Sequence, residues 1–147
     1  MFDLYANELA VWNEQVNLTA ITDPDSVRVR HFLDSLTVLK AAALPPGACV
    51  IDVGTGAGFP GLPLKITNPG IHLTLLEATG KKVAFLQHLI DLFRLENVST
   101  VNARAEDAGH DPALRGAFDV VLARAARLPS LLEYLLPFAK VGACASP

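Results

Sequence analysis

The sequence has few of the features that mark a secreted or metal-binding protein. Of its 147 residues only two, Cys49 and Cys144, are cysteines. Their spacing makes neither a C-x-x-C motif nor a cysteine–histidine zinc pattern, and the four histidines are too scattered to form a metal site. We therefore expect no metal, and two reduced thiols that pack as small apolar groups.

Long apolar runs and an N-terminal leader are also lacking. No stretch of about 18 consecutive apolar residues occurs, although a membrane-spanning helix requires one. The first residues, MFDLY, lack the basic start and apolar core of a secretory signal peptide. These absences argue against a membrane protein and predict a soluble, cytoplasmic one.

Charged residues are scarce, at 18% of the chain, whereas apolar residues make up 51%. This composition favours a buried parallel sheet over disorder, and the length suits one domain. The net charge of −3 counts against nucleic-acid binding, because phosphates are contacted mainly by Lys and Arg. An RNA-binding function would need the basic residues to gather on one face.

Two helices are predicted before the first strand. Apolar side chains recur every three or four residues over 2–16, which is typical of an amphipathic helix. Asp23 and Pro24 have the residue types of an N-cap and a first helical position, and predict a second helix to about Lys40. The LPPG segment at 44–47 then breaks the pattern. We expect a single domain, in which residues 1–46 form a helical extension to a core at 47–147.

Strand-like runs alternate with helical patterns in this core. We expect strands at 49–53, 71–76, 98–102 and 118–122, and helices at about 60–66, 81–94 and 129–139. The alternation predicts an α/β fold with a parallel sheet and helices on both faces. Residues 141–147 are too short for a full fifth strand, so we expect the sheet to stop at four strands with the C-terminal strands missing.

A glycine-rich loop at 54–61 follows the first predicted strand. Its sequence, GTGAGFPG, matches G-x-G-x-x-G from Gly56 onward. Glycines let the backbone turn tightly and approach a ligand. Glu77 ends the second strand 21 residues after Gly56, where a carboxylate can accept hydrogen bonds from ribose hydroxyls. The loop therefore predicts a nucleoside cofactor, and by spacing alone NAD fits as well as a methyl donor.

Other residues favour S-adenosylmethionine. Asp52, at the end of the first strand, would attract a cationic amine or its water and would repel a pyrophosphate. Segment 104–107 follows the third strand, where it could contact adenine or simply start an acidic helix. Arg124 follows the fourth strand, at the sheet edge where ligands bind, and could touch the cofactor or a substrate phosphate. The chain also has no room for the substrate domain of a dehydrogenase.

The residues after the fourth strand indicate which atom would be methylated. The Asn/Asp-Pro-Pro-aromatic run of enzymes that methylate exocyclic amines is missing there, and so is a cysteine nucleophile for pyrimidine C5. Guanine N7 has no proton to remove, so alignment with the methyl group and electrostatic complementarity would suffice. We assign no catalytic acid or base.

Two pairs of residues are candidates for contacts with the substrate. Lys81 and Lys82 begin a predicted helix, where positive charge opposes the helix dipole. They either contact RNA phosphate or serve solubility. His31 and Asp34 share a helix face, and either form a hydrogen bond on the helix surface or contact the substrate.

These segments together resemble the glucose-inhibited division protein B family of class I, Rossmann-like methyltransferases. The resemblance covers nearly the whole chain, and its most specific pieces are NLTAI from Asn17, RHFLDSL from Arg30, residues 52–63, GKKVAFL from Gly80, RAE from Arg104 and ARA from Ala123. It implies a bacterial enzyme that uses S-adenosylmethionine to make 7-methylguanosine in 16S rRNA of the small ribosomal subunit. We expect a monomer.

The resemblance also implies a set of cofactor-binding residues. They are Gly54, Gly56 and Phe59 in the loop, Glu77 at the ribose, Ala105 and Glu106 at the adenine, and Arg124 at the cofactor pocket. Where the family has a Pro-Gly-Gly turn, a strand and a longer tail, this chain reads VGACASP and ends. Two alternatives therefore stay open: an inactive nucleoside-binding fragment and an NAD-dependent oxidoreductase domain.

Overall fold

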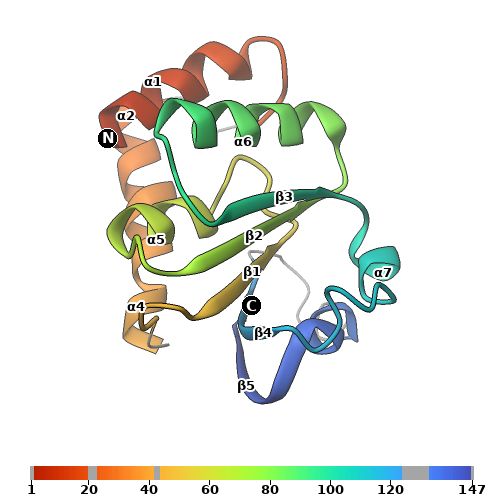
Figure 1. Ribbon diagram of the computed structural model, residues 1–147. Helices are drawn as coiled ribbons and strands as arrows, with labels where there is room; N and C mark the ends of the chain where they lie inside the picture. The colour runs from red at the N-terminus through yellow and green to blue at the C-terminus, as the bar shows by residue number, and fades with distance from the viewer. Residues whose placement is uncertain (1, 20–22, 42–43, 124–132, 147) are drawn as a thin grey trace.

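The computed structural model of the protein describes residues 2–19, 23–41, 44–123 and 133–146. Its centre is a parallel sheet (Figure 1) with the strand order β3-β2-β1-β4-β5. The strands are β1 Cys49–Val53, β2 His72–Glu77, β3 Val98–Asn102, β4 Phe118–Leu122 and β5 Ala139–Ser146. Every pair of neighbours is parallel. The predicted α/β fold is confirmed.

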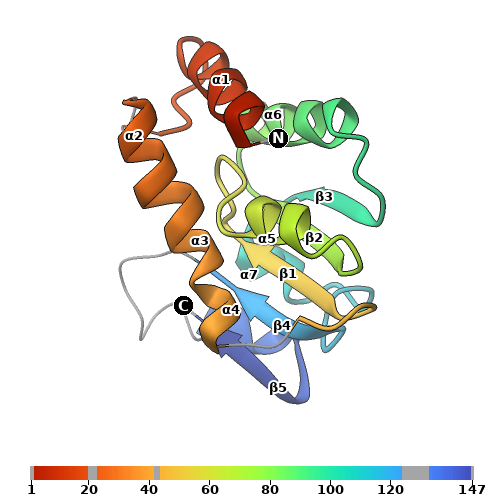
Figure 2. The ribbon, with the colours of Figure 1, turned by 90° about the vertical axis from the view of Figure 1, so that its left-hand side faces the viewer.

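Helices precede the sheet and connect its strands. They are α1 Phe2–Asn13, α2 Pro24–Val27, the π-helix η1 Arg28–Leu33, α3 Asp34–Leu36, α4 Val38–Ala41, α5 Gly61–Thr67, α6 Gly80–Leu92, α7 Ala105–Ala108 and the 3₁₀ turn η2 Leu136–Phe138. The Asp23 carboxylate accepts a hydrogen bond from Ser26 N at 3.0 Å, as an N-cap does. The predicted second helix is thus present, and Figure 2 shows 24–41 as one rod that runs past α5.

Both faces of the sheet are covered. On one face, side chains such as Val50 and Leu75 join a core with the N-terminal helices, α5 and α6. On the other face, Ile51 and Val121 pack against Ala108 of α7 and Phe138 of η2. Alternate residues of each strand point to opposite faces, so a strand with both faces covered is apolar almost throughout.

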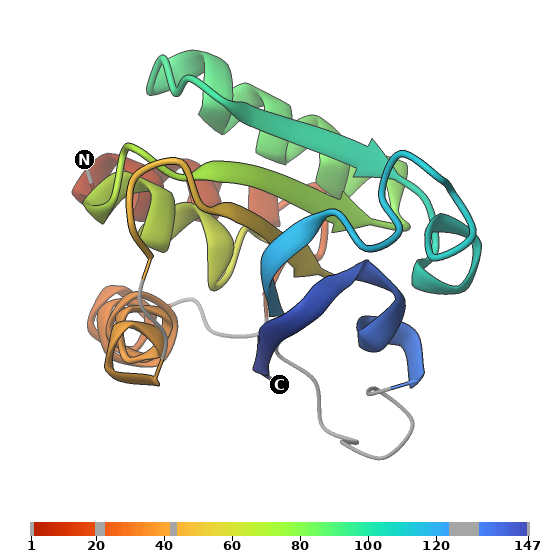
Figure 3. The ribbon, with the colours of Figure 1, turned by 60° about the horizontal axis from the view of Figure 1, so that its bottom comes forward.

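The C-terminal part of the chain corrects one prediction. Instead of a sheet that stops at four strands, β5 adds a fifth at the edge beside β4 (Figure 3). Of the helix expected at 129–139, residues 129–132 lie outside the described residues, and the predicted end is wrong because η2 gives way to β5 at Ala139. Segment 139–146 is rich in small residues that favour strands only weakly, so its conformation follows from pairing with β4 rather than from propensity.

Candidate functional site

The carboxyl ends of the strands bring most of the predicted site residues to one edge of the sheet. β1 is followed by the glycine loop, β2 ends at Glu77, and β3 is followed by α7. The chain runs from β1 outward to β3 and then returns to the other side of β1 with β4. Ligands bind at such a reversal of strand order, outside the carboxyl ends. Arg124, the predicted residue after β4, lies outside the described residues.

The glycine loop has a backbone that only glycine adopts without strain. Gly54, Gly56 and Gly58 have φ angles of 67°, 60° and 102°, in the left-handed region where a Cβ is unfavourable. A Cβ built on Gly54 or Gly56 would meet no atom within 4 Å. Open space therefore lies beside these two residues, and the backbone is accessible to a ligand.

The carboxylate of Asp52 joins the two ends of the glycine loop by hydrogen bonds. Asp52 is fully buried, and its Oδ2 accepts hydrogen bonds from Thr55 Oγ1 at 2.6 Å and from Gly61 N at 2.8 Å. The two donors lie near the two ends of the loop, so one oxygen fixes its span. The structure shows that Asp52 holds the loop together, and its expected place near a cationic amine or its water stays a prediction.

Glu77 faces the loop from the neighbouring strand. Its Oε1 accepts a hydrogen bond from Gly56 N at 2.9 Å and its Oε2 accepts one from Thr79 N at 2.9 Å. Glu77 is only 8% exposed. Each carboxylate oxygen can accept a second hydrogen bond, so the group retains capacity for hydroxyl donors of a ligand. The backbone of the glycine loop and the Glu77 carboxylate thus lie together, as the loop and strand pattern predict.

Phe59 belongs to the loop, but its ring points away from open space. The residue is 5% exposed, and its ring stacks on His31, with centroids 4.4 Å apart and planes at 4°, and on Tyr5 at 5.3 Å. Any contact of Phe59 with a ligand would therefore come from its backbone. Of the two interpretations of His31 and Asp34, the one that places both on the helix surface does not fit His31, because this residue is 8% exposed while Asp34 is exposed.

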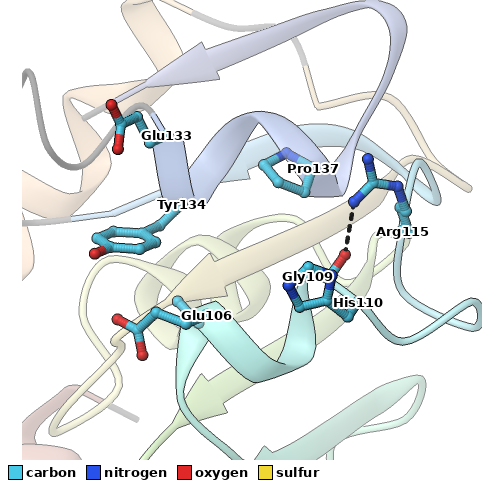
Figure 4. A pocket seen from close by; sticks show the side chains of 8 residues that line it. Glu106, Gly109, His110, Arg115, Glu133, Tyr134 and Pro137 are labelled. Carbon is cyan, nitrogen blue, oxygen red and sulfur yellow. Dashed lines mark hydrogen bonds between the residues drawn. The ribbon is translucent and has the colours of Figure 1, made fainter.

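Ala105 and Glu106 lie in α7, whose acidic start is one of the two interpretations of segment 104–107. They line a surface cleft of about 250 Å³ between α7 and the segment before β5. In Figure 4, Glu133 and Tyr134 form the wall opposite Glu106. Arg115 is held at the cleft by a hydrogen bond from its guanidinium to Gly109 O, 3.0 Å long. The cleft offers carboxylates and a phenol to a ligand.

Sequence reasoning missed Tyr5 as part of this site. It is fully buried, and its hydroxyl donates a hydrogen bond to Ala57 O at 2.5 Å. Burial raises the pKa of the phenol well above 10, and the Asp52 carboxylate raises it further. In the sequence Tyr5 is one apolar position of a helical pattern, so no local signal distinguishes it.

The described part of the chain offers neither a metal site nor a membrane-spanning helix. No group of three or more His, Cys, Asp or Glu side chains there could hold a metal ion. None of the helices described is both long and apolar enough to cross a bilayer. Lys81 and Lys82 stand in the first turn of α6, directly after the Glu77–Thr79 contact.

Known proteins are similar to this chain in sequence and fold. Ribosomal RNA small subunit methyltransferase G of Roseiflexus castenholzii is 51% identical over 142 residues, which are 96% of this chain and 60% of the relative. The protein of the same name from Desulfitobacterium hafniense is 49% identical over 96% of this chain and 58% of its own. A crystal structure of a SAM-dependent methyltransferase from Aquifex aeolicus is 25% identical, with a TM-score of 0.59, and covers 80% of this chain and 63% of that one.

The sequence relatives are longer than this chain, which spans about 60% of their length. A family model described as GidB, rRNA small subunit methyltransferase G, matches residues 1–144. This match confirms the resemblance inferred from the motifs: the chain belongs to the GidB family of rRNA small subunit methyltransferase G.

Proposed function

We propose that this chain is the S-adenosylmethionine-binding part of a methyltransferase that modifies N7 of a guanine in 16S rRNA. Family membership supports the reaction class. The observation that carries the proposal is the contact between the Gly56 amide and the Glu77 carboxylate at the carboxyl edge of the sheet. We further propose that residues 1–46 act as a helical extension to a cofactor-binding core at 47–147, within one domain.

The residues present fit a nucleoside bound through its ribose and methionine parts. Gly54 and Gly56 expose their backbone to open space, which lets a ligand approach closely. Glu77 would accept hydrogen bonds from the ribose hydroxyls with its remaining capacity. Ala105 and Glu106 would border the adenine from α7, and Arg124 would contact the pocket from the end of β4.

The same geometry disfavours the NAD alternative. In a dinucleotide site the pyrophosphate lies at the start of the helix that follows the first strand. Here Gly61 N, at the start of α5, already donates to Asp52 Oδ2. A second negative group placed beside that buried carboxylate would be repelled.

Methylation at N7 requires little acid–base catalysis from the protein. When bound, S-adenosylmethionine supplies a methyl group attached to a positively charged sulfur. The N7 lone pair would accept this methyl group as the sulfur–carbon bond breaks and S-adenosylhomocysteine leaves, with no proton to remove, so the protein needs to orient the two reactants and to exclude water. Lys81 and Lys82, in the first turn of α6, would contact RNA phosphate near the mouth of the site. We propose a monomer that acts in the cytoplasm on the small ribosomal subunit.

Cofactor binding is the first test. Calorimetry is expected to show binding of S-adenosylmethionine and of S-adenosylhomocysteine and no heat with NADH. Binding of NADH without the other two would contradict the proposed function and restore the dinucleotide alternative.

Methyl transfer is the second test. Small subunits lacking the modification are incubated with the protein and labelled S-adenosylmethionine, and the RNA is then reduced and cleaved with aniline, which breaks the chain at 7-methylguanosine. We expect one cleavage site in 16S rRNA. Label without cleavage would mean that another atom is methylated. Cofactor binding with no label in the RNA would support the inactive nucleoside-binding fragment.

A further inference from the structure

The N-terminal helices, which are remote in sequence from the core, contact the glycine loop. Tyr5 of α1 reaches the carbonyl of Ala57, 52 residues away along the chain. The same phenol ring stacks on Phe59 of the loop. Asp52 and Glu77, whose carboxylates also bind the loop, belong to the sheet. Tyr5 therefore adds an anchor from a separate element.

Gly58 has no side chain, which leaves room for the Tyr5 hydroxyl. A Cβ at residue 58 would lie 2.3 Å from Tyr5 Oη and 2.7 Å from Leu62 Cδ1. Both distances are far inside van der Waals contact, so Gly58 is needed for the phenol to reach the loop and not only for its φ of 102°. By contrast Gly54 and Gly56 leave open space. The loop thus has a face open to a ligand and a face packed against α1.

His31 also contacts the loop, by stacking on Phe59. The two rings are nearly parallel at 4.4 Å, and His31 Nε2 lies 2.9 Å from Thr19 Oγ1. His31 stands in the π-helix η1, a rare form that is often found at functional sites. Phe59 therefore stacks on both Tyr5 and His31.

We propose that Tyr5 and His31 are positioning residues for the methyl donor: they hold Ala57 and Phe59 so that the Gly54–Gly56 backbone keeps its binding geometry. The N-terminal helices are then part of the cofactor site. This role rests on the proposed function. The Tyr5 phenol is a neutral donor at neutral pH, and burial, which raises its pKa, extends this neutral form further into the alkaline range.

The test compares two substitutions in the same helix. Tyr5→Phe removes only the hydroxyl, and Leu9→Val trims another buried α1 side chain that packs in the same core. Both are expected to lower stability slightly. In calorimetry with S-adenosylhomocysteine we expect Tyr5→Phe to raise Kd by about 3- to 10-fold, the loss of one hydrogen bond, and Leu9→Val to leave Kd unchanged.

A spectroscopic measure separates positioning from general destabilisation. Ala57 C=O and Gly58 N–H belong to one peptide group, so the Gly58 amide resonance of the ligand-free protein should shift in Tyr5→Phe and not in Leu9→Val. Should Tyr5→Phe fail to fold, Phe59→Leu keeps an apolar side chain but loses the stack, and it is expected to weaken binding in the same direction.

Unchanged affinity in Tyr5→Phe, or in Phe59→Leu if that variant replaces it, would overturn the positioning role while leaving the proposed function intact. An equal loss of affinity in Leu9→Val would also overturn it, because the effect would then follow stability alone. If the unsubstituted protein binds neither S-adenosylmethionine nor S-adenosylhomocysteine, the proposed function fails, and the positioning role falls with it.

Discussion

At the scale of single residues, two glycines have similar φ angles, but only one of them lies in the candidate site. Gly54 has a φ of 67° and lies in the candidate site, whereas Gly116 has a φ of 65° in the loop before β4. A Cβ on Gly54 meets nothing within 4 Å, and one on Gly116 would lie 4.0 Å from Ala139 O. A methyl group would therefore cause no clash at either position, and only backbone strain is common to both.

Alanine substitutions at Gly54 and Gly116 should affect stability alike and ligand binding differently. Gly54→Ala and Gly116→Ala should each lower the free energy of unfolding by about 1 to 2 kcal/mol, because each forces a Cβ into the left-handed region. Only Gly54→Ala should weaken S-adenosylhomocysteine binding, since its methyl group would enter the open space beside the loop. Urea unfolding and calorimetry check the two effects, and a binding loss in Gly116→Ala would contradict the assignment.

At the scale of elements, one carboxylate joins three strands. Asp119 of β4 accepts a hydrogen bond from Cys49 N of β1 at 2.8 Å and forms an ion pair with Lys140 of β5 at 3.1 Å. The hydrogen bond from Cys49 N and, secondly, that from Lys140 lower the pKa of Asp119 below 3.8. The charged form is therefore favoured in the folded protein.

A pH dependence follows from the direction of this shift. A carboxyl group whose pKa is lower when folded stabilises the fold above its unfolded value of 3.8, and this contribution is lost as the pH falls through the folded pKa. Asp119→Asn should lower the free energy of unfolding at pH 7 by a few tenths of a kcal/mol, since the side chain is 42% exposed. The difference from the unsubstituted protein should shrink as the pH falls below 3.8.

Urea titrations between pH 7 and pH 3 measure this difference. Glu14→Gln serves as the control, because Glu14 is exposed in the turn that directly follows α1, outside these strands. A difference for Asp119→Asn that stays constant over the whole pH range would mean that its charge does not contribute.

At the scale of the whole molecule, ligand binding should stabilise the fold. A ligand that binds only the folded state adds about 2.7 kcal/mol to the unfolding free energy at 100 times its Kd. For a chain of this size that corresponds to a rise in Tm of about 5 to 10 °C. Scanning calorimetry with S-adenosylhomocysteine should show this rise, and NADH at equal concentration should not. A rise with NADH alone would reverse the cofactor assignment.

The sequence by itself determined the parts of the protein that depend on local chemistry. Strands β1, β3 and β4 have the predicted bounds, because short runs of β-branched and apolar residues end at turn residues. The glycine loop and its distance from Glu77 follow from spacing, since a parallel sheet places consecutive strand ends at one edge. The predicted Asp23 N-cap is confirmed because capping involves only neighbouring residues.

Only the tertiary structure decided the features that need a distant partner. β5 is a strand because β4 offers it an edge, and residues 139–146 have no strong preference of their own. The ring of Phe59 turns inward because two helices from the N-terminal region bury it. The Tyr5 contact with Ala57 likewise joins residues that no local pattern connects. Propensity and capping act over a few residues, whereas burial and strand pairing depend on which segments meet in space.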